Sequence, residues 1–187
     1  MAQDKQKLLV EKFHKATVLL AEKLVGEDSS DFSTFPFVVK LQDGNMALFM
    51  PGADPNSADH DYLHAFVVNA GLTLELKLKH LHALESGAPP RGHNLVVLFD
   101  QLGDQTKEFI QNHIRKQVEG SQSHLAISDA AKNNLNIDIC WDARFLLDKS
   151  SYAFERWRYI YEQQNKGSWF CGYIELYRAL EERIESM

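Results

Sequence analysis

The sequence predicts an all-α protein, an up-and-down helical bundle with a short irregular or β-hairpin insertion after the first helix. Apolar residues recur at helical spacing along most of the chain, which is typical of helices packed on a common core. Residues 26–62 break this pattern with three of the five prolines. The 187 residues, 44% hydrophobic and 25% charged, predict one globular domain over 1–187 and exclude a disordered tail, a collagen-like fibre and a disulfide scaffold.

The first predicted helix spans residues 4–25. One face of it carries an apolar stripe, formed by Leu9, Phe13, Ala16, Leu20 and Leu24, and Gly26 ends it. In the insertion, the apolar runs FPFVVKL and NMALFM flank a turn that contains Asp43-Gly44. Two β-rich runs around Asp-Gly are typical of a short hairpin, so we predict one here.

The net charge of −6, from 20 basic and 26 acidic residues, belongs to the insertion. Residues 26–62 hold seven acidic residues and one basic residue, Lys40, whereas the remainder of the chain is neutral. The acidic total therefore does not exclude a contact between the helical frame and phosphate or RNA. The concentration of acidic residues marks the insertion as a separate surface, suited to a basic partner.

A second, central helix is predicted over residues 57–85, where a broad apolar surface indicates burial. Ser57 or Asp59 would cap its start, and Gly87 with Pro89-Pro90 would end it. Residues 120–124 are predicted as a polar loop. The remaining predicted helices span 94–102, 104–118, 128–148, 151–164 and 168–185.

The cysteines and the apolar runs of the sequence indicate the compartment. Cys140 and Cys171 fit free thiols in a reducing cytoplasm, and no uncharged apolar run approaches the roughly 20 residues that span a bilayer. We therefore expect a soluble cytoplasmic protein without membrane contact.

The phosphate-binding, zinc-protease, serine-hydrolase and calcium-loop motifs are missing. His60 and His64, one helical turn apart, could ligate one metal, but a polar first helical turn is the simpler interpretation, and we predict neither metal nor cofactor.

The segment RWRYIYE, residues 156–162, is the densest group of functional residue types. Arginines interleaved with aromatic residues can hold phosphates and stack bases. The alternative is structural: aromatic residues at helical spacing usually belong to a core, and Arg158 with Glu162 would form an ordinary ion pair.

Two stretches resemble the HEPN superfamily, helical-bundle domains named for nucleotide binding in higher eukaryotes and prokaryotes. The first is LTLELKLKHLHALESGAPPRGHNLVVLFDQL, residues 72–102, in which a leucine- and lysine-rich helix leads to Gly92-His93-Asn94-Leu95. The second is AFERWRYIYE, residues 153–162. The likeness runs from residue 57 to the end of the chain. It implies a HEPN-like bundle, a homodimer, and ligand-binding roles for His93, Asn94, Arg156, Arg158 and Tyr159.

Many HEPN proteins are metal-independent ribonucleases whose motif is an arginine followed four to six positions later by a histidine. This sequence departs from that motif, because Tyr161 or Glu162 stands near the place of the histidine. A histidine that titrates near neutrality suits acid–base cleavage, and tyrosine or glutamate suits it less. The catalytic candidates implied by the resemblance are Arg156, Arg158, Tyr161 and Glu162.

Three functions follow as hypotheses. The first is a non-catalytic or regulatory HEPN-like protein that binds a nucleotide, RNA or a protein partner, within a defence or stress module. The second is a purely structural interaction module that docks a basic partner through residues 26–62. The third is a ribonuclease with an altered active site. For His93-Asn94, capping of the helix that follows is the simpler role, because asparagine is a preferred N-cap.

Overall fold

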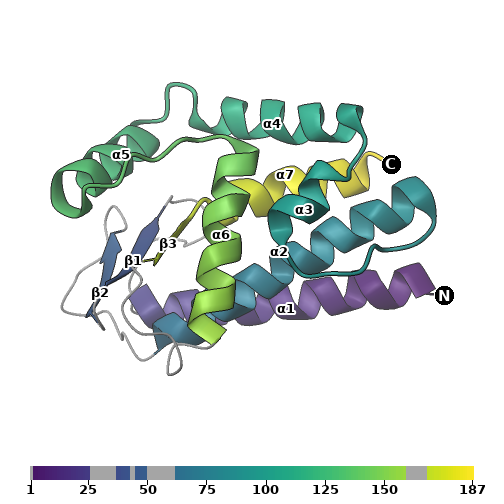
Figure 1. The fold of residues 1–187 in the computed structure, drawn as a ribbon, viewed down its shortest axis with the longest axis horizontal. Coiled ribbons are helices and arrows are strands. Elements are labelled where there is room, and N and C mark those ends of the chain that lie inside the picture. Colours follow the sequence, from purple (N-terminus) through teal and green to yellow (C-terminus); the bar gives the residue numbers. More distant parts are fainter. Residues whose placement is uncertain (1, 26–36, 43–44, 50–61, 159–167) are drawn as a thin grey trace.

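The computed structural model describes residues 2–25, 37–42, 45–49, 62–158 and 168–187. These residues form a mostly helical protein with a small three-stranded sheet at one end (Figure 1). The mostly helical fold class is therefore confirmed. The helices are α1 (Ala2–Val25), α2 (Leu63–Ser86), α3 (Leu95–Asp100), α4 (Asp104–Val118), α5 (Gln122–Leu135), α6 (Ala143–Arg158) and α7 (Tyr173–Glu185).

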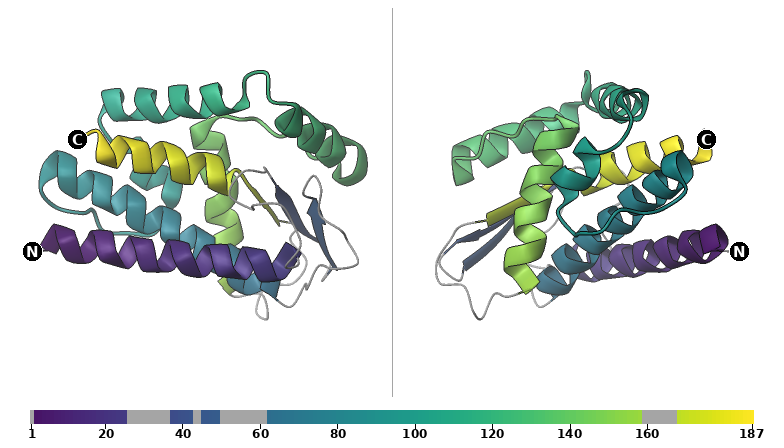
Figure 2. Two further views of the ribbon diagram at one scale, coloured as in Figure 1. Left: turned by 180° about the vertical axis from the view of Figure 1, so that it is seen from behind. Right: turned by 45° about the vertical axis from the view of Figure 1, so that its right-hand side comes forward.

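Helix α2 is the centre of the packing, as its broad apolar surface predicts. Helices α1 and α7 run alongside it and α6 crosses it, while α4 covers the far side of α7 (Figure 2). Phe66, Leu74 and Leu81 are completely buried. Each such side chain contributes roughly 1.5–3 kcal/mol when it leaves water, so this helix carries much of the hydrophobic stabilisation. The helix ends at Gly87, whose φ of 83° lies in the left-handed region that glycine adopts without strain.

The predicted hairpin is present. Strands β1 (Val38–Gln42) and β2 (Asn45–Phe49) are antiparallel, with Val38 opposite Phe49 and Gln42 opposite Asn45. Phe37, Val38 and Val39 are buried in the main core, so this part of the insertion is integral to the fold. The acidic residues of the insertion lie outside the described residues.

The hairpin pairs with a third strand that the sequence analysis did not predict. Strand β3 (Ser168–Cys171) joins β1 antiparallel, with Val38 opposite Cys171, and the strand order is β2-β1-β3. The predicted helix over 168–185 is therefore wrong in its first turn, and α7 begins only at Tyr173. Gly172, with φ at 72°, makes the sharp turn between strand and helix.

The predicted helices over 128–148 and 151–164 are also corrected. Helix α5 begins at Gln122, within the predicted polar loop, and ends where Asn136 takes the left-handed conformation with φ at 53°. Helix α6 then begins at Ala143, capped by Asp142, whose carboxylate accepts the Phe145 N–H at 3.0 Å. Asparagine tolerates the left-handed region and aspartate is a preferred N-cap, so these two residues break the apolar periodicity. The described part of α6 runs through Ser150 and Ser151 without a break.

The predicted start of the central helix at residue 57 is wrong, because α2 begins six residues later, at Leu63, with Tyr62 as its N-cap. Helix α4 matches its prediction, and α3 is shorter than the predicted 94–102. The proposed caps Ser57 and Asp59 lie outside the described residues. Cys140 is exposed and Cys171 buried, both as free thiols. Within the described ranges, no helix is both long enough and apolar enough to traverse a bilayer.

Candidate functional site

The element Gly92-His93-Asn94-Leu95 forms the entry to α3. Gly92 has φ at 106°, a conformation open to glycine, and turns the chain into the helix. Asn94 is the N-cap, and its side-chain Oδ1 accepts the Val97 N–H at 3.0 Å. The capping role expected for Asn94 is confirmed.

This geometry makes a testable prediction. Asn94→Ala should lower the free energy of unfolding by about 1 kcal/mol, the usual cost of losing an N-cap hydrogen bond. Asn94→Ser should recover most of the loss, since serine also caps. Urea denaturation of the three proteins measures the difference. An unchanged midpoint for Asn94→Ala would show that the hydrogen bond contributes nothing to stability.

His93 reaches across to the central helix. Its Nδ1 lies 2.9 Å from Oε1 of Glu75 on α2, and the same oxygen accepts the Lys79 ammonium at 2.8 Å. Glu75 is almost completely buried, whereas 68% of the His93 side chain is exposed. The buried carboxylate therefore holds the ring through Nδ1, while most of the side chain stays exposed. Among the described residues, Oε2 of Glu75 has no hydrogen-bond partner.

A hydrogen bond joins the first stretch of the HEPN resemblance to α6, two residues before the second stretch begins. The Leu95 N–H donates to Oγ of Ser151 on α6 at 2.9 Å, and both residues are buried. Arg156 lies five residues further along α6, roughly 7.5 Å along the helix axis, and Arg158 is the last residue of that helix. The side chains of Arg156 and Arg158 lie outside the described part of the chain, as do Tyr159, Tyr161 and Glu162.

The histidine pair considered for a metal is only half described, since His60 lies outside the described residues. His64 is partly buried, and desolvation lowers its pKa. In the part of the chain that the structure describes, no three His, Cys, Asp or Glu side chains come together to hold a metal ion.

A buried polar cluster between α1, α2 and α7 went unpredicted. Lys77 is completely buried on α2, forms an ion pair with Glu181 of α7, and has its ammonium 4.0 Å from the centre of the Tyr177 ring. His14 of α1 stacks on Tyr177 and hydrogen-bonds the Tyr173 hydroxyl at 3.0 Å. The sequence signal was a lysine beside Leu74 and Leu78 on the apolar face of α2, a position usually held by an apolar residue.

Burial controls the protonation of this cluster. Desolvation lowers the pKa of Lys77 to about 7, although the carboxylates of Glu185 and Glu11 oppose the shift. Desolvation also lowers the pKa of His14 to about 4, helped by the nearby Lys77 charge. Burial raises the pKa of Tyr177 to about 12. A lysine amine poised near neutrality is unusual, since its ordinary pKa lies above 10.

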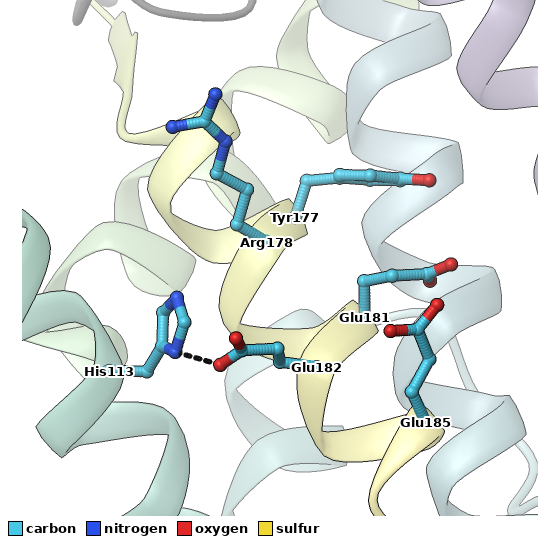
Figure 3. Close-up of a pocket in the computed structure, with 6 residues that line it drawn as sticks. All are labelled: His113, Tyr177, Arg178, Glu181, Glu182 and Glu185. Carbon is cyan, nitrogen blue, oxygen red and sulfur yellow. Dashed lines mark ion pairs between the residues drawn. The ribbon is translucent and has the colours of Figure 1, made fainter.

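An open pocket of about 230 Å³ adjoins this cluster. Tyr177, Glu181 and Glu185 lie along α7, while His113 enters from α4 and pairs with Glu182 at 2.5 Å (Figure 3). Arg178 completes the lining. The three glutamates make the pocket acidic, and it does not include His93 or α6. His93 and Asn94, the described members of the predicted ligand-binding set, therefore do not line this pocket.

Comparison of the chain with protein-family models, with curated proteins and with solved structures finds no match.

Proposed function

We propose that this chain is a HEPN-like helical protein with a non-catalytic binding role, and that it holds a phosphate group of a nucleotide or RNA. The proposed site lies where the His93 loop meets α6. The supporting observation is the hydrogen bond from Leu95, in the first stretch of the HEPN resemblance, to Ser151 on α6, two residues before the second stretch begins. His93 is exposed there and is held in one orientation by Glu75.

The chemistry of the site favours an anion. Arg156 and Arg158 supply cationic groups that bind phosphate in a fork, and an aromatic residue such as Tyr159 can stack a base. His93 adds a ring nitrogen that can donate a hydrogen bond to a phosphate oxygen. The HEPN resemblance also implies that two copies of the chain form a homodimer. The same resemblance implies a regulatory role in a defence or stress module.

Titration of the purified protein tests this function. AMP, ADP and a short single-stranded RNA should bind, and His93→Ala or Arg158→Ala should each weaken binding by about tenfold, the usual cost of one charge-assisted hydrogen bond. Affinity should also fall with rising salt. Arg115→Ala is the matched control, because Arg115 is exposed on α4 and bonds only its neighbour Asn112 among the described residues.

Failure of all three probes to bind at low salt would overturn the proposed function. Equal loss in the Arg115→Ala control would show that the binding is non-specific. Sedimentation of the same preparation tests the proposed homodimer, which should run at twice the mass of one chain.

The contact between His93 and Glu75 also supports the ribonuclease hypothesis. A buried carboxylate that orients an exposed histidine is the arrangement of a general base and its positioning group. His93 could thus take the place of the histidine that is missing after Arg156. Incubation with labelled RNA tests this alternative, since cleavage by His93 requires that His93→Ala abolish it and that Glu75→Gln reduce it. Cleavage that persists in both variants excludes this pair.

Deleting the insertion cannot test the hypothesis that residues 26–62 dock a basic partner. Removing residues 30–55 would delete Phe37, Val38 and Val39 from the core and unfold the protein. Neutralising substitutions at Asp54, Asp59 and Asp61 remove acidic charge and retain Phe37, Val38 and Val39. A basic partner that docks on this surface should then lose affinity, and full retention of binding would argue against it.

A further inference from the structure

Three side chains at the junction of α5 and α7 form a continuous hydrogen-bonded row. Oγ of Ser121, the N-cap of α5, lies 2.7 Å from Nδ1 of His124. Nε2 of the same ring lies 2.9 Å from Oε1 of Glu175, in the first turn of α7. A hydroxyl, an imidazole and a carboxylate in this order have the connectivity of a nucleophile, its base and the group that orients the base.

The partners determine where the protons lie. An ionised Glu175 can only accept, so His124 must donate through Nε2. In the neutral ring Nδ1 is then the acceptor, and the Ser121 hydroxyl donates to it. Because that hydrogen is used, the 3.0 Å contact between Ser121 and Ser123 must have Ser123 as its donor. The Ser121 oxygen therefore faces a base on one side and a hydrogen-bond donor on the other.

The row is held rigidly. Glu175 is 3% exposed, and its backbone carbonyl accepts the Gln117 side-chain amide at 3.1 Å. The Trp141 ring meets the edge of the His124 ring, with centroids 4.6 Å apart, and its Nε1–H is fixed by Ser128. Ser121 itself is only partly buried, so a substrate can reach the hydroxyl more readily than the ring or the carboxylate.

The first turn of α5 supplies donors beside this hydroxyl. The N–H groups of residues 122–124 have no acceptor within an α-helix, and the first helical bond is from Leu125 to the Ser121 carbonyl. Among the described residues, no side chain caps this turn. Backbone N–H groups at a helix start are suited to an oxygen that becomes negatively charged during acyl transfer.

We propose that Ser121, His124 and Glu175 form a hydrolytic site for esters of small acyl groups, separate from the proposed nucleotide site. The Ser121 oxygen attacks the carbonyl carbon while its proton passes to Nδ1 of His124. The bond from that carbon to the alcohol oxygen breaks, and the alcohol leaves with the proton from His124. Water then attacks the acyl-serine, gives one proton to His124, and releases the carboxylic acid as Ser121 regains its hydrogen. Ser121 and His124 are the catalytic residues, and Glu175 is a positioning residue.

A purely structural role for the same three residues predicts something different. As an N-cap with a buried acid–histidine pair, they would stabilise the fold but leave Ser121 no more reactive than any other serine. Covalent labelling separates the two roles, because a fluorophosphonate reacts with an activated serine. In that reaction the Ser121 oxygen bonds to phosphorus, fluoride leaves, and the hydroxyl proton passes to His124.

The full chain is incubated with a fluorophosphonate and mapped by peptide mass spectrometry, and hydrolysis of p-nitrophenyl acetate is followed in parallel. The expected result is one label, on Ser121. Ser121→Ala should lower hydrolysis by roughly 10²-fold or more, and Glu175→Gln should slow labelling by roughly tenfold or more. Ser186→Ala, which removes an exposed hydroxyl at the end of α7, is the control and should label and hydrolyse like the unmodified chain.

An unlabelled chain, or a label on any residue other than Ser121, overturns the proposal. The mapping uses the unmodified protein, so this outcome does not depend on whether a variant folds. Circular dichroism of Ser121→Ala and Glu175→Gln shows whether a lost rate reflects unfolding. A folded Glu175→Gln that labels at the full rate would remove Glu175 from the site.

Discussion

Replacing Gly172 with alanine is expected to lower the free energy of unfolding by roughly 2–5 kcal/mol, through backbone strain and overpacking combined. Gly172 turns the chain from β3 into α7 with φ at 72°, a conformation that side chains rarely adopt. A Cβ atom there would lie 2.7 Å and 2.8 Å from the two methyl carbons of Leu146. Leu146 is completely buried on α6, so its methyl groups must shift within the core to make room.

A second glycine separates the two causes. Gly87 has a similar φ of 83°, but a Cβ there would meet nothing within 4 Å. Gly87→Ala should therefore show the strain alone, about 1–2 kcal/mol. Leu146→Ala removes the colliding methyl groups, so in that background Gly172→Ala should cost less than it does alone. Urea denaturation measures the four variants and the unmodified chain. Equal losses at Gly172 and Gly87 would contradict the predicted collision.

The same turn connects the sheet to the polar residues of α7. Tyr173 follows Gly172 directly and contacts His14, and Glu175 lies two residues further on. Both side chains are buried, so their positions depend on where α7 begins. A shift at Gly172 would therefore disturb two polar clusters as well as the packing of Leu146.

The helices of the frame were predictable from local patterns, whereas the third strand was not. Apolar periodicity located α1, α2 and α4, and the Asp-Gly turn located the β1–β2 hairpin. Strand β3 has only four residues, Ser168–Cys171, and exists because it pairs with β1 more than a hundred residues earlier. Its sequence continues the apolar pattern of α7, so only the conformation of Gly172 distinguishes the strand from the helix.

The candidate sites likewise divide into residues that a local pattern identifies and residues that only the tertiary structure brings together. The Gly-His-Asn-Leu element identified His93 and Asn94, because a cap is a local feature. Glu75, in contrast, lies within a leucine- and lysine-rich helix, where an acidic residue usually faces solvent. Its role depends on the loop that brings His93 onto it. His124 and Glu175 are 51 residues apart, and no spacing rule connects them.

The pH dependence of stability should reveal the buried Lys77. Its pKa is about 7 in the folded chain and about 10.5 in the unfolded chain. Between these values the unfolded state binds more protons, so the free energy of unfolding rises with pH. From pH 7 to 8.5 the expected gain is about 1–2 kcal/mol. The gain is lost as pH falls through 7. The window ends at 8.5 because burial raises the pKa of Cys171 well above 9, so at higher pH the thiol opposes the lysine and flattens the slope.

Lys77→Met should remove this slope and raise stability at pH 7 by about 1–4 kcal/mol, because a buried ammonium is replaced by an apolar side chain of similar length. Glu181, the partner that remains, is about one-third exposed and can be hydrated.

Lys116→Met on α4 is the control, since Lys116 is exposed and its removal should leave the slope unchanged. Urea denaturation at pH 7, 7.75 and 8.5 measures all three proteins. A slope that survives in Lys77→Met would assign the titration to another group, and a loss of stability at pH 7 would mean that the ion pair with Glu181 outweighs the desolvation of the ammonium.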